Sequence, residues 1–384
     1  VNRWHAGWSS RQRIMRGLAD RDWPTLYSSG AETVWEIGRP AWHAQPWLPT
    51  IGRDGKLQVD CPGRLLLRWP SRRRVDTAAV AMHAHLMRRA LRRGRPSLTV
   101  LIFDALLWPY VRRLDPGTVI YYSYDAHHLS PGWTNDLARQ EAELVDRADL
   151  IVGYTAGMLE CLPGDGAQRG RVLPPGVDIG PFCDAANARC PVDLARIPHP
   201  RIGYVGRVNQ KLDYELVYQI ARARPDWHWV FCGSVGAGAD GRFAADRAAE
   251  ARWLQCRDLP NVHALGPVPN ADVPRYLAHM DVNVMCYRTD AGGWWTEIFP
   301  LKSLEYLAAG KPIVSARVRS ILGYASDIAF ASTPDDWIDA IEQAIASGGV
   351  GTTASRHATA RENTWDQRID CLQTWIDELV RLPQ

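Results

Sequence analysis

Long apolar runs are missing from this sequence of 384 residues, and its first residues do not look like a leader peptide. No window approaches the roughly 18 to 20 consecutive apolar residues that a membrane-spanning helix needs. Residues 1–8 lack the charged and apolar regions of a secretory signal. We therefore expect a cytoplasmic protein without a membrane-spanning helix.

Common metal-binding and nucleotide-binding motifs are also missing. The eight cysteines are scattered, with no C-x-x-C pair and no Cys/His group at zinc spacing, so we interpret them as reduced, mostly buried thiols. No P-loop G-x-x-x-x-G-K-[ST] is present. A D-x-D pair, Asp20 and Asp22, follows a predicted helix, where we expect it to face solvent. We therefore expect no bound metal.

Positive charge is concentrated in one stretch. The net charge is +3, but from Arg53 to Arg95 there are 12 Lys/Arg against three acids, Asp54, Asp60 and Asp76. Such a stretch can contact anionic lipid head groups or a lipid-linked diphosphate, each cation adding about 1 kcal/mol near an anionic membrane. It can equally be a solvated arginine-rich face. Peripheral contact with an anionic membrane through residues 53–95 is thus one of two open interpretations.

Short apolar strands alternate with amphipathic helices along the chain, which is the pattern of parallel α/β layers. Residues 98–103, 118–122 and 150–154 are predicted strands, with a helix from about Asn135 before the last of them. Residues 181–200 are rich in Pro, Ala and Cys without periodicity, which is typical of a linker. We predict an N-terminal domain over residues 1–180, a linker over 181–200, a C-terminal domain over 201–363, and a helix over 364–384 that crosses back to the N-terminal domain.

The most specific pattern lies at residues 295–314, predicted to form a loop, a helix, a glycine stop and a strand. Two carboxylates, Glu297 and Glu305, flank the start of that helix. The segment resembles the signature of the retaining group 1 glycosyltransferases, E-x-F followed by L-E-A/Y-x-A-x-G-x-P-V/I-V. The matching residues are Glu297, Phe299, Leu304, Glu305, Gly310, Pro312 and Val314. Two solvated glutamates beside an ordinary helix are the plain alternative.

The resemblance implies an α/β protein of the GT-B fold, with two Rossmann-like domains facing each other across a cleft that holds a sugar nucleotide. It implies that Glu297 holds the donor sugar and Glu305 the ribose, while the helix N-terminus offers N–H groups to the diphosphate. The other donor-binding candidates of this loop are Thr296, Ile298, Phe299 and Leu301. The family usually has glycine where this chain has Ile298 and Pro300, and Pro300 has no N–H to donate.

A turn at residues 203–211 resembles the V-G-R…K segment of the same family. The resemblance makes Gly206 a donor-binding candidate. Arg207 and Lys211 are candidates for both donor binding and catalysis, because cations at the carboxyl end of a strand can neutralise the charge on a departing nucleoside diphosphate. A surface pair of Lys211 with Asp213 is the alternative explanation for the lysine.

In the first half of the chain, residues 121–128 end a predicted strand with one aspartate and two histidines. Related bacterial cell-surface polysaccharide transferases carry an Asp at the position of Asp125. His127 is a candidate for contact with the donor sugar, or for assisting the acceptor hydroxyl together with Asp125. A loop histidine without a chemical role is the alternative for His127 and His128.

The beginning of the chain carries one more candidate. The resemblance places a loop at residues 6–11 beneath the donor phosphates, where Gly7 would let the backbone approach the ligand. A helix cap at Ser9 or Ser10 explains the same loop. Residues 1–3 look like the tail of a first strand, and we expect further residues upstream.

Together these patterns predict a hexosyltransferase, independent of metals and cofactors, that moves a sugar from a UDP- or GDP-linked donor to a glycan or lipid-linked acceptor hydroxyl. Retention of configuration and a role in cell-surface polysaccharide or glycolipid biosynthesis follow from the resemblance alone. A nucleotide-sugar 2-epimerase of the same fold and a non-catalytic sugar-nucleotide or glycan-binding protein are the alternatives. We expect no nucleic-acid partner, and a cytoplasmic location with optional contact at the inner face of the membrane.

Overall fold

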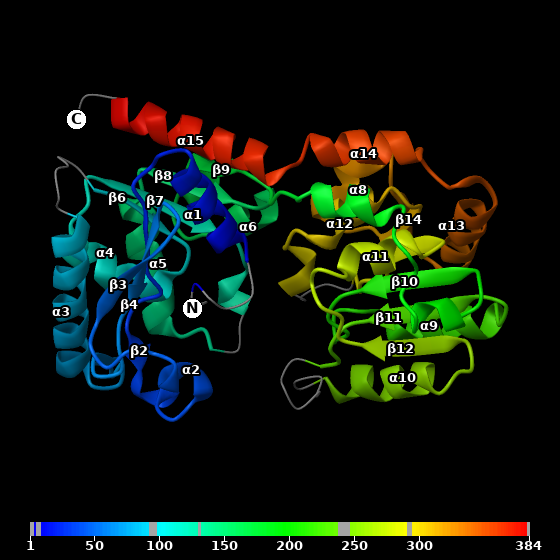
Figure 1. Ribbon diagram of the computed structural model, residues 1–384, viewed down its shortest axis with the longest axis horizontal. Helices are drawn as coiled ribbons and strands as arrows, with labels where there is room; N and C mark the ends of the chain where they lie inside the picture. Colours follow the sequence, from blue (N-terminus) through cyan, green and yellow to red (C-terminus); the bar gives the residue numbers. More distant parts are fainter. Residues whose placement is uncertain are drawn as a thin grey trace. The chain divides into compact units, whose positions relative to one another are not determined.

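The computed structural model describes Trp4 and residues 9–91, 98–129, 132–236, 246–289 and 294–381. The chain forms two compact units (Figure 1): unit 1 comprises Val1–Pro174 with Arg368–Gln384, and unit 2 comprises Pro175–Gln367. Gly7 and residues 1–3, for which we predict a donor contact and a strand tail, lie outside the described residues. Among the described helices, none combines the length and the apolar character that crossing a membrane requires.

The larger sheet of unit 1 is parallel, with the strand order β6-β7-β8-β9. Its strands are β6 (Thr99–Ile102), β7 (Thr118–Ser123), β8 (Leu150–Gly153) and β9 (Gly170–Val172). Every residue of β7 and β8 is buried, as expected for parallel strands that are covered on both faces. Leu144 and Val145 of helix α5 (Asn135–Arg147) belong to the same apolar cluster as Val119 and Tyr121 of β7.

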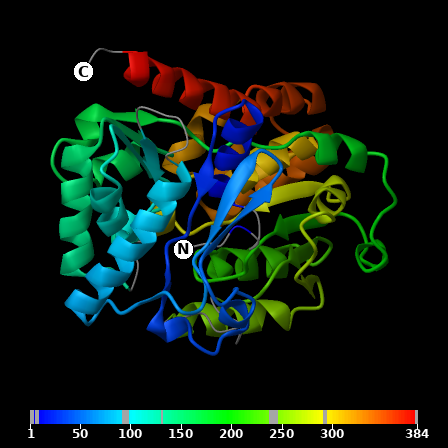
Figure 2. The same ribbon diagram turned by 60° about the vertical axis from the view of Figure 1, so that its left-hand side comes forward.

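Shorter strands precede this sheet. β1 (Leu26–Tyr27), β4 (Leu57–Cys61) and β3 (Thr50–Asp54) form a three-stranded sheet in that order, and β2 (Glu32–Thr33) pairs in parallel with β5 (Leu67–Arg68). β3 and β4 form an antiparallel hairpin, drawn as blue arrows in Figure 2. Its turn contains Gly55, whose φ of 61° suits a residue without a side chain.

The helices of unit 1 lie around these strands. Besides α5 they are α1 (Ser10–Asp20), α2 (Pro40–His43), α3 (Arg73–Leu91), α4 (Trp108–Leu114), α6 (Ala156–Glu160) and α7 (Gly166–Arg169), with 3-10 turns η1 (Val34–Glu36), η2 (Ala105–Leu107) and η3 (His127–Leu129). The last helix, α15 (Trp365–Arg381), packs closely on α1, since a Cβ on Gly17 would lie 2.1 Å from Ile369 Cδ1. Arg21 also forms an ion pair with Asp370, at 2.7 Å.

Unit 2 contains a six-stranded parallel sheet with the order β12-β11-β10-β13-β14-β15. Its strands are β10 (Arg201–Val205), β11 (His228–Cys232), β12 (Val262–Gly266), β13 (Val282–Met285), β14 (Ile313–Ala316) and β15 (Ala329–Ala331). Counted along the unit, this order is 3-2-1-4-5-6, which is the doubly wound order of dinucleotide-binding domains.

Helices connect these strands. They are α8 (Gly180–Ala185), α9 (Tyr214–Ala223), α10 (Arg247–Arg257), α11 (Val273–Ala278), α12 (Lys302–Ala309), α13 (Pro334–Ser347) and α14 (Thr353–Arg361), with 3-10 turns η4 (Leu194–Arg196), η5 (Trp294–Thr296) and η6 (Arg319–Tyr324). The buried side-chain amide of Asn261, just before β12, donates to three backbone carbonyls, those of Ala221, Arg224 and Trp227. This contact holds the start of the strand to the end of α9.

Residues 181–200, predicted as a linker, lie inside unit 2 and contain most of α8 and all of η4. Leu194 is fully buried and Ile197 is buried, so this segment contributes to the core of unit 2. Tyr276 Oη donates to the carboxylate of Asp193 at 2.8 Å. A few buried apolar side chains anchor the segment, although its Pro, Ala and Cys content lacks a helical period. At the other end, residues 364–367 belong to unit 2 and residues 368–384 to unit 1.

Candidate functional site

The strand order of unit 2 reverses between β10 and β13, which are neighbours in the sheet. In open parallel sheets, ligands bind outside the carboxyl ends of the strands at such a switch point. Gly206 and Arg207 directly follow β10, and Cys286 and Tyr287 directly follow β13. The V-G-R…K segment therefore lies where this fold favours a ligand.

Glycines with positive φ line the carboxyl ends of three adjacent strands: Gly206 (141°) after β10, Gly233 (155°) after β11 and Gly266 (79°) at the end of β12. Their backbones are in contact, since the N–H of Gly206 donates to Cys232 O and the N–H of Gly233 donates to Gly266 O, each at 2.7 Å. A Cβ on Gly233 would lie 2.0 Å from the carbonyl oxygen of Gly206. A side chain is thus excluded at Gly233, where the strand ends meet backbone to backbone, whereas the space beside Gly266 is open.

Lys302, the first residue of α12, reaches over this glycine edge. A Cβ on Gly206 would lie 1.9 Å from Lys302 Nζ. The same ammonium lies 5.4 Å from the ring centre of Tyr204, within cation–π range. Val205 N–H donates to Tyr306 Oη at 3.0 Å, which ties α12 to the end of β10. The position of Lys302 is therefore fixed by packing and by a buried hydrogen bond.

Lys211 lies close to Lys302 and Arg207. Its ammonium is 5.3 Å from the ring centre of Tyr287, and that ring is 6.4 Å from the ring of Tyr204. The carbonyl of Lys211 accepts from the N–H of Arg288 at 2.8 Å, which fixes the turn after β10 against the segment after β13. The two lysines thus sit over neighbouring tyrosine rings.

The pKa values of both lysines reflect this crowding. Burial, followed by the charges of Lys302 and Arg207, lowers the pKa of Lys211 to about 7. Burial also lowers the pKa of Lys302, although the charge of Glu305 opposes that change. In the part of the chain that the structure describes, neither ammonium has a hydrogen bond or an ion pair. Like charges in a partly buried site favour an anion, because its charge would offset their repulsion.

The loop before α12 is held in place by serine contacts. Ser320 Oγ donates to the carbonyl of Ile298 at 3.0 Å. Ser303 donates to the carbonyl of Pro300 twice, through its N–H at 2.9 Å and its Oγ at 2.8 Å. Leu301, the last residue before α12, exposes 45% of its surface. The loop before α12 is therefore held in place, and Leu301 is the most accessible apolar side chain of residues 295–301.

The predicted donor-binding residues of this loop differ in accessibility. Phe299 is buried, and its ring meets Tyr324 edge-on with the centroids 6.5 Å apart, so its backbone alone is left for a ligand. Thr296 Oγ1 donates to Glu297 Oε1 at 3.2 Å, and both residues are half-buried. Glu305 lies one helical turn after Lys302, and its charge raises the pKa of that lysine. Glu305 therefore belongs electrostatically to the cation cluster.

The structure brings together four predicted residues, Gly206, Arg207, Lys211 and Glu305. They lie around Lys302, a residue that the sequence analysis does not identify. A lysine at the first position of a helix faces the positive end of the helix dipole, which is unfavourable. That local conflict, three residues before Glu305, is the signal in the sequence that could have identified it. Natural sequences tolerate such conflicts mainly at functional sites.

The predicted residues of unit 1 lie just past the carboxyl end of β7. The Asp125 carboxylate accepts from the N–H of Ala126 at 2.9 Å, and the side chain is exposed. His127 is half-buried, with its ring edge-on to Tyr124 at 5.1 Å. Its buried Nε2 has no hydrogen-bond partner among the described residues. A buried polar atom without a partner is costly, which makes His127 a candidate for contact with a ligand.

Arg11 of α1 reaches the same place and is also missing from the sequence prediction. Its guanidinium lies over the ring of Tyr124, 4.6 Å from the centroid. The side chain is buried, and its Nε has no hydrogen-bond partner in the described ranges. Burial raises the pKa of Tyr124 to about 12, against the opposing charge of Arg11. Unit 1 thus holds a buried cation and a histidine beside the end of its central strand.

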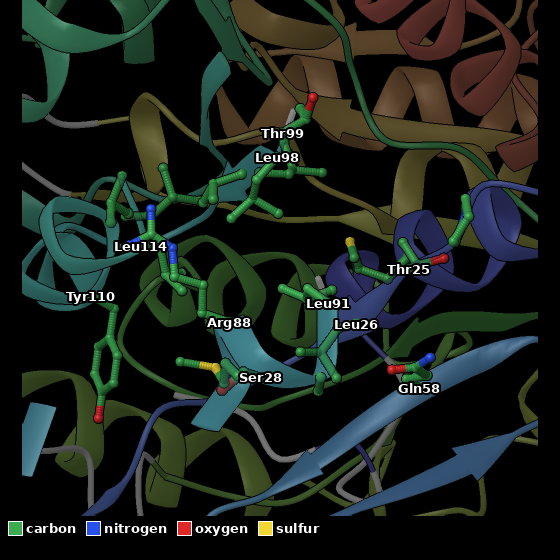
Figure 3. A pocket seen from close by; sticks show the side chains of 18 of the residues that line it. Thr25, Leu26, Ser28, Gln58, Arg88, Leu91, Leu98, Thr99, Tyr110 and Leu114 are labelled. Atoms are coloured by element: carbon green, nitrogen blue, oxygen red, sulfur yellow. The ribbon is translucent and has the colours of Figure 1, made fainter. Parts of the chain in front are cut away.

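A cavity of about 1110 Å³ lies elsewhere in unit 1. Figure 3 shows side chains around it from several parts of the chain, among them Leu26 and Ser28 near β1, Gln58 of β4, Leu98 and Thr99 near β6, Arg88 and Leu91 of α3, and Tyr110 and Leu114 of α4. Among the described residues, β1 and β6 are both end strands of their sheets. Neither Asp125 nor His127 lines the cavity, so it is separate from the predicted site.

The D-x-D pair of Asp20 and Asp22 is predicted to face solvent rather than to bind a metal. Both side chains lie at the surface, and Asp22 pairs with Lys56 at 2.7 Å. In the described part of the chain, no three His, Cys, Asp or Glu side chains come together as a metal site.

Residues 199–347 match the family model described as glycosyl transferases group 1. A Bacillus subtilis (strain 168) protein, the glycosyltransferase TuaH with an inferred role in teichuronic acid biosynthesis, is 29% identical over 170 residues, 43% of this chain. The chain spans about 40% of the length of that relative.

Solved structures match nearly the whole chain in fold, although their sequences are only distantly similar to it. Sucrose-phosphate synthase from Thermosynechococcus elongatus gives a TM-score of 0.68 at 13% identity, covering 97% of this chain and 93% of that one. The E. coli trehalose-6-phosphate protein bound with UDP-2-fluoro glucose gives 0.66 at 14% identity, covering 100% and 98%. Anabaena Alr3699/HepE in complex with UDP-glucose gives 0.62 at 16% identity, covering 91% and 98%.

The chain therefore has the GT-B fold, and the predicted α/β class with Rossmann-like sheets is confirmed. In its second unit, residues 199–347 resemble group 1 of the glycosyl transferases, as the sequence analysis predicts.

Proposed function

We propose that this protein is a glycosyltransferase that moves a hexose from a nucleoside diphosphate to a hydroxyl of a glycan or lipid-linked acceptor. The observation that carries the proposal is the cation cluster of Arg207, Lys211 and Lys302 at the switch point of unit 2. Its lysine ammonium groups have no hydrogen bond or ion pair with the described residues, and bare glycine backbone adjoins them. A diphosphate supplies the negative charge that such a site lacks.

The proposed roles follow from where charge develops. When the bond between the sugar and the diphosphate breaks, negative charge grows on the phosphate oxygens, and cations that are already in place stabilise it. Arg207, Lys211 and Lys302 would do so without a metal or an organic cofactor. Glu305 would bind the ribose, and Glu297 the transferred sugar. The glycine edge at Gly206 would let the backbone approach the phosphates.

The proposal includes retention of configuration. The leaving phosphate, held by the cations, would accept the proton of the acceptor hydroxyl as it attacks from the same face. Asp125 and His127 would then act on the acceptor or on the donor sugar, rather than as a covalent nucleophile.

The donor and acceptor classes rest on similarity. The solved relatives bound to UDP-glucose and UDP-2-fluoro glucose support a UDP-linked donor, with GDP as the second choice. The named role of the Bacillus relative in teichuronic acid biosynthesis supports a cell-surface polysaccharide as the product. We propose that the enzyme works in the cytoplasm, with optional peripheral contact at the inner face of the membrane.

A binding and turnover experiment tests this function. Thermal unfolding is measured with UDP, GDP, ADP and dTDP in the presence of EDTA, since a ligand at 100 times its dissociation constant adds about 2.7 kcal/mol of stability. We expect a clear shift with one nucleotide, lost in Arg207→Ala and Glu305→Ala but kept in Arg257→Ala, an exposed arginine at the end of α10.

The matching nucleotide sugar is then incubated with the protein, and the products are identified by NMR. Release of the nucleoside diphosphate with a new glycoside supports transfer. An epimerised nucleotide sugar would establish the epimerase instead, and binding without any turnover on a range of acceptors would favour a non-catalytic role. No shift with any nucleotide, in folded protein, would contradict the proposal.

A further inference from the structure

Large apolar side chains stand exposed together in one part of unit 1. Between residues 34 and 75 the exposed fractions reach 59% for Trp35, 62% for Trp47, 65% for Leu48 and 64% for Leu65. Ile37, Trp69 and Val75 are exposed as well. Exposed apolar residues on a protein surface are normally scattered singly, whereas gathered ones mark a contact surface.

Two backbone segments bring part of this set together. The N–H of Arg64 donates to Pro46 O at 2.8 Å, and the N–H of Leu65 donates to Trp47 O at 3.2 Å. The Arg64 guanidinium lies over the Trp47 ring, 4.8 Å from its centre. Trp47, Leu48 and Leu65 therefore form one patch around Arg64.

The remaining tryptophans follow a second pair of segments. β2 and β5 are paired with Thr33 opposite Arg68, so Trp35 and Trp69 come shortly after the ends of adjacent strands. The Arg72 guanidinium lies over the ring of Trp69, 4.9 Å from its centre. Figure 1 shows β2 and α2 together at the lower end of unit 1, with α15 at its upper end.

We call these residues the Trp/Arg surface. Its apolar members are Trp35, Ile37, Trp47, Leu48, Leu65 and Trp69, and its basic members are Arg39 and Arg72 to Arg74. The basic members are exposed, and the nearby acids are few. Between residues 34 and 75 there are eight Lys/Arg and three acids, of which Asp60 is buried in contact with His83.

We propose that the Trp/Arg surface docks on an anionic lipid bilayer. Tryptophan rings favour the zone between lipid tails and water, where one face of the residue is apolar and its N–H remains wet. Arginines next to them meet the negative head groups. Arg39 pairs with Glu36 at 3.1 Å, whereas Arg72 to Arg74 are exposed and have no ion pair with the described residues. The protein would lie on the membrane, held by inserted side chains and charge.

The surface differs from the basic stretch that the sequence indicates. Within residues 53–95, Arg68 is buried and pairs with Asp76 at 2.9 Å, and Arg64 donates to the carbonyls of His43 and Gln45. These arginines hold the fold together. The exposed tryptophans and leucines, which charge counting overlooks, supply the apolar part of the contact.

Vesicle flotation tests the proposal on the whole chain. Vesicles of phosphatidylcholine with about one third phosphatidylglycerol are compared with pure phosphatidylcholine vesicles, at low and high salt. We expect binding to the anionic vesicles only, weakened by salt because the Debye length shortens. No nucleotide or sugar is present, so the result is independent of the proposed transfer activity.

Two sets of variants separate the apolar and basic parts. Trp47→Ala with Leu48→Ala removes exposed apolar area and should weaken vesicle binding by about tenfold. Arg72→Gln with Arg73→Gln should weaken it by about fivefold for each charge. The matched control is Leu254→Ala with Arg257→Gln on α10, an exposed leucine and an exposed arginine of unit 2, which should bind like the unmodified chain.

A second measurement does not depend on affinity. Lipids brominated in their tails quench tryptophans that insert, so quenching should fall in Trp35→Phe and Trp47→Phe. Failure to float with anionic vesicles would overturn the proposal. Equal binding by the Trp47/Leu48 variant and the α10 control would overturn it too. So would binding to a purified protein or glycan without binding to vesicles.

Discussion

Lys302 Nζ lies directly against the backbone of Gly206, so a Cβ on that glycine would be only 1.9 Å from the ammonium nitrogen. The two residues are far apart in the sequence, yet the bond from Val205 N–H to Tyr306 Oη holds their elements together. The contact places a third cation beside Arg207 and Lys211. It also explains why a side chain at position 206 cannot be accommodated without moving that cation.

Substitution of Gly206 by alanine should therefore impair the donor site. The new methyl group would displace the Lys302 ammonium and force alanine to a φ of 141°, a conformation that costs on the order of 1–3 kcal/mol. We expect nucleotide affinity to fall by about tenfold or more, together with a lower melting temperature. Calorimetric titration and thermal unfolding measure the two effects.

Gly266→Ala is the matched control for that variant. Gly266 also has a positive φ, 79°, but nothing lies within 4 Å of a Cβ built there. It should lose stability through strain without the same loss of nucleotide binding. If both alanine variants bind the nucleotide equally, the contact between Gly206 and Lys302 has no role in the site.

Replacing Lys302 by glutamine should lower transfer more than it lowers stability. The ammonium has no hydrogen bond or ion pair with the described residues, and burial lowers its pKa, so removing its charge relieves repulsion within the fold. Loss of one preorganised charge facing the leaving group typically costs about 10²–10³ in kcat. Steady-state kinetics and thermal unfolding check both parts. Wild-type kcat in Lys302→Gln would remove this lysine from the mechanism.

Much of the framework of both units could be predicted from the sequence. The strands predicted at residues 98–103, 118–122 and 150–154 agree with β6, β7 and β8 within one residue. Each is a short apolar run bounded by turn residues, and such runs indicate buried parallel strands. The end of α12 could also be predicted from the sequence. The expected glycine stop is Gly310, which follows the helix with a φ of 70°.

Residues that act through long-range contacts could not be predicted in the same way. Lys302 and Arg11 become candidate site residues only when folding places them beside Gly206 and Tyr124. No local sequence pattern contains those pairs. Residues 181–200 show the converse. Their composition suggests a linker, whereas the burial of Leu194 depends on contacts that lie outside the segment.

His127 offers a prediction for unit 1. Its buried Nε2 lacks a partner among the described residues, beside a buried arginine and an exposed aspartate. His127→Asn should lower the rate of transfer to the acceptor by about tenfold, because the substrate would lose a hydrogen bond to Nε2, while nucleotide affinity stays unchanged. The neighbouring His128→Asn is the control and should retain activity. A transfer rate unaffected in His127→Asn would leave this histidine a structural residue.

The titration of Lys211 gives a prediction with opposite signs for stability and binding. Its pKa in the folded protein is lowered to about 7 from 10.5, chiefly by burial and then by the charges of Lys302 and Arg207. Between pH 7 and 10.5 the unfolded chain holds a proton that the folded chain has released, so stability without ligand should rise with pH across this window. Lys211→Met should remove that part of the pH dependence in thermal unfolding.

Nucleotide binding should move the other way. A bound diphosphate favours the charged ammonium, so binding above pH 7 requires the uptake of a proton, and the affinity should fall as the pH rises. The phosphate groups are already largely ionised there, with a second pKa of about 6, so the change reports the lysine. Titration calorimetry in two buffers with different ionisation enthalpies counts the protons taken up. Uptake that persists in Lys211→Met would assign the titration to another group and separate Lys211 from the diphosphate, whereas its loss would show that this lysine becomes charged when the donor binds.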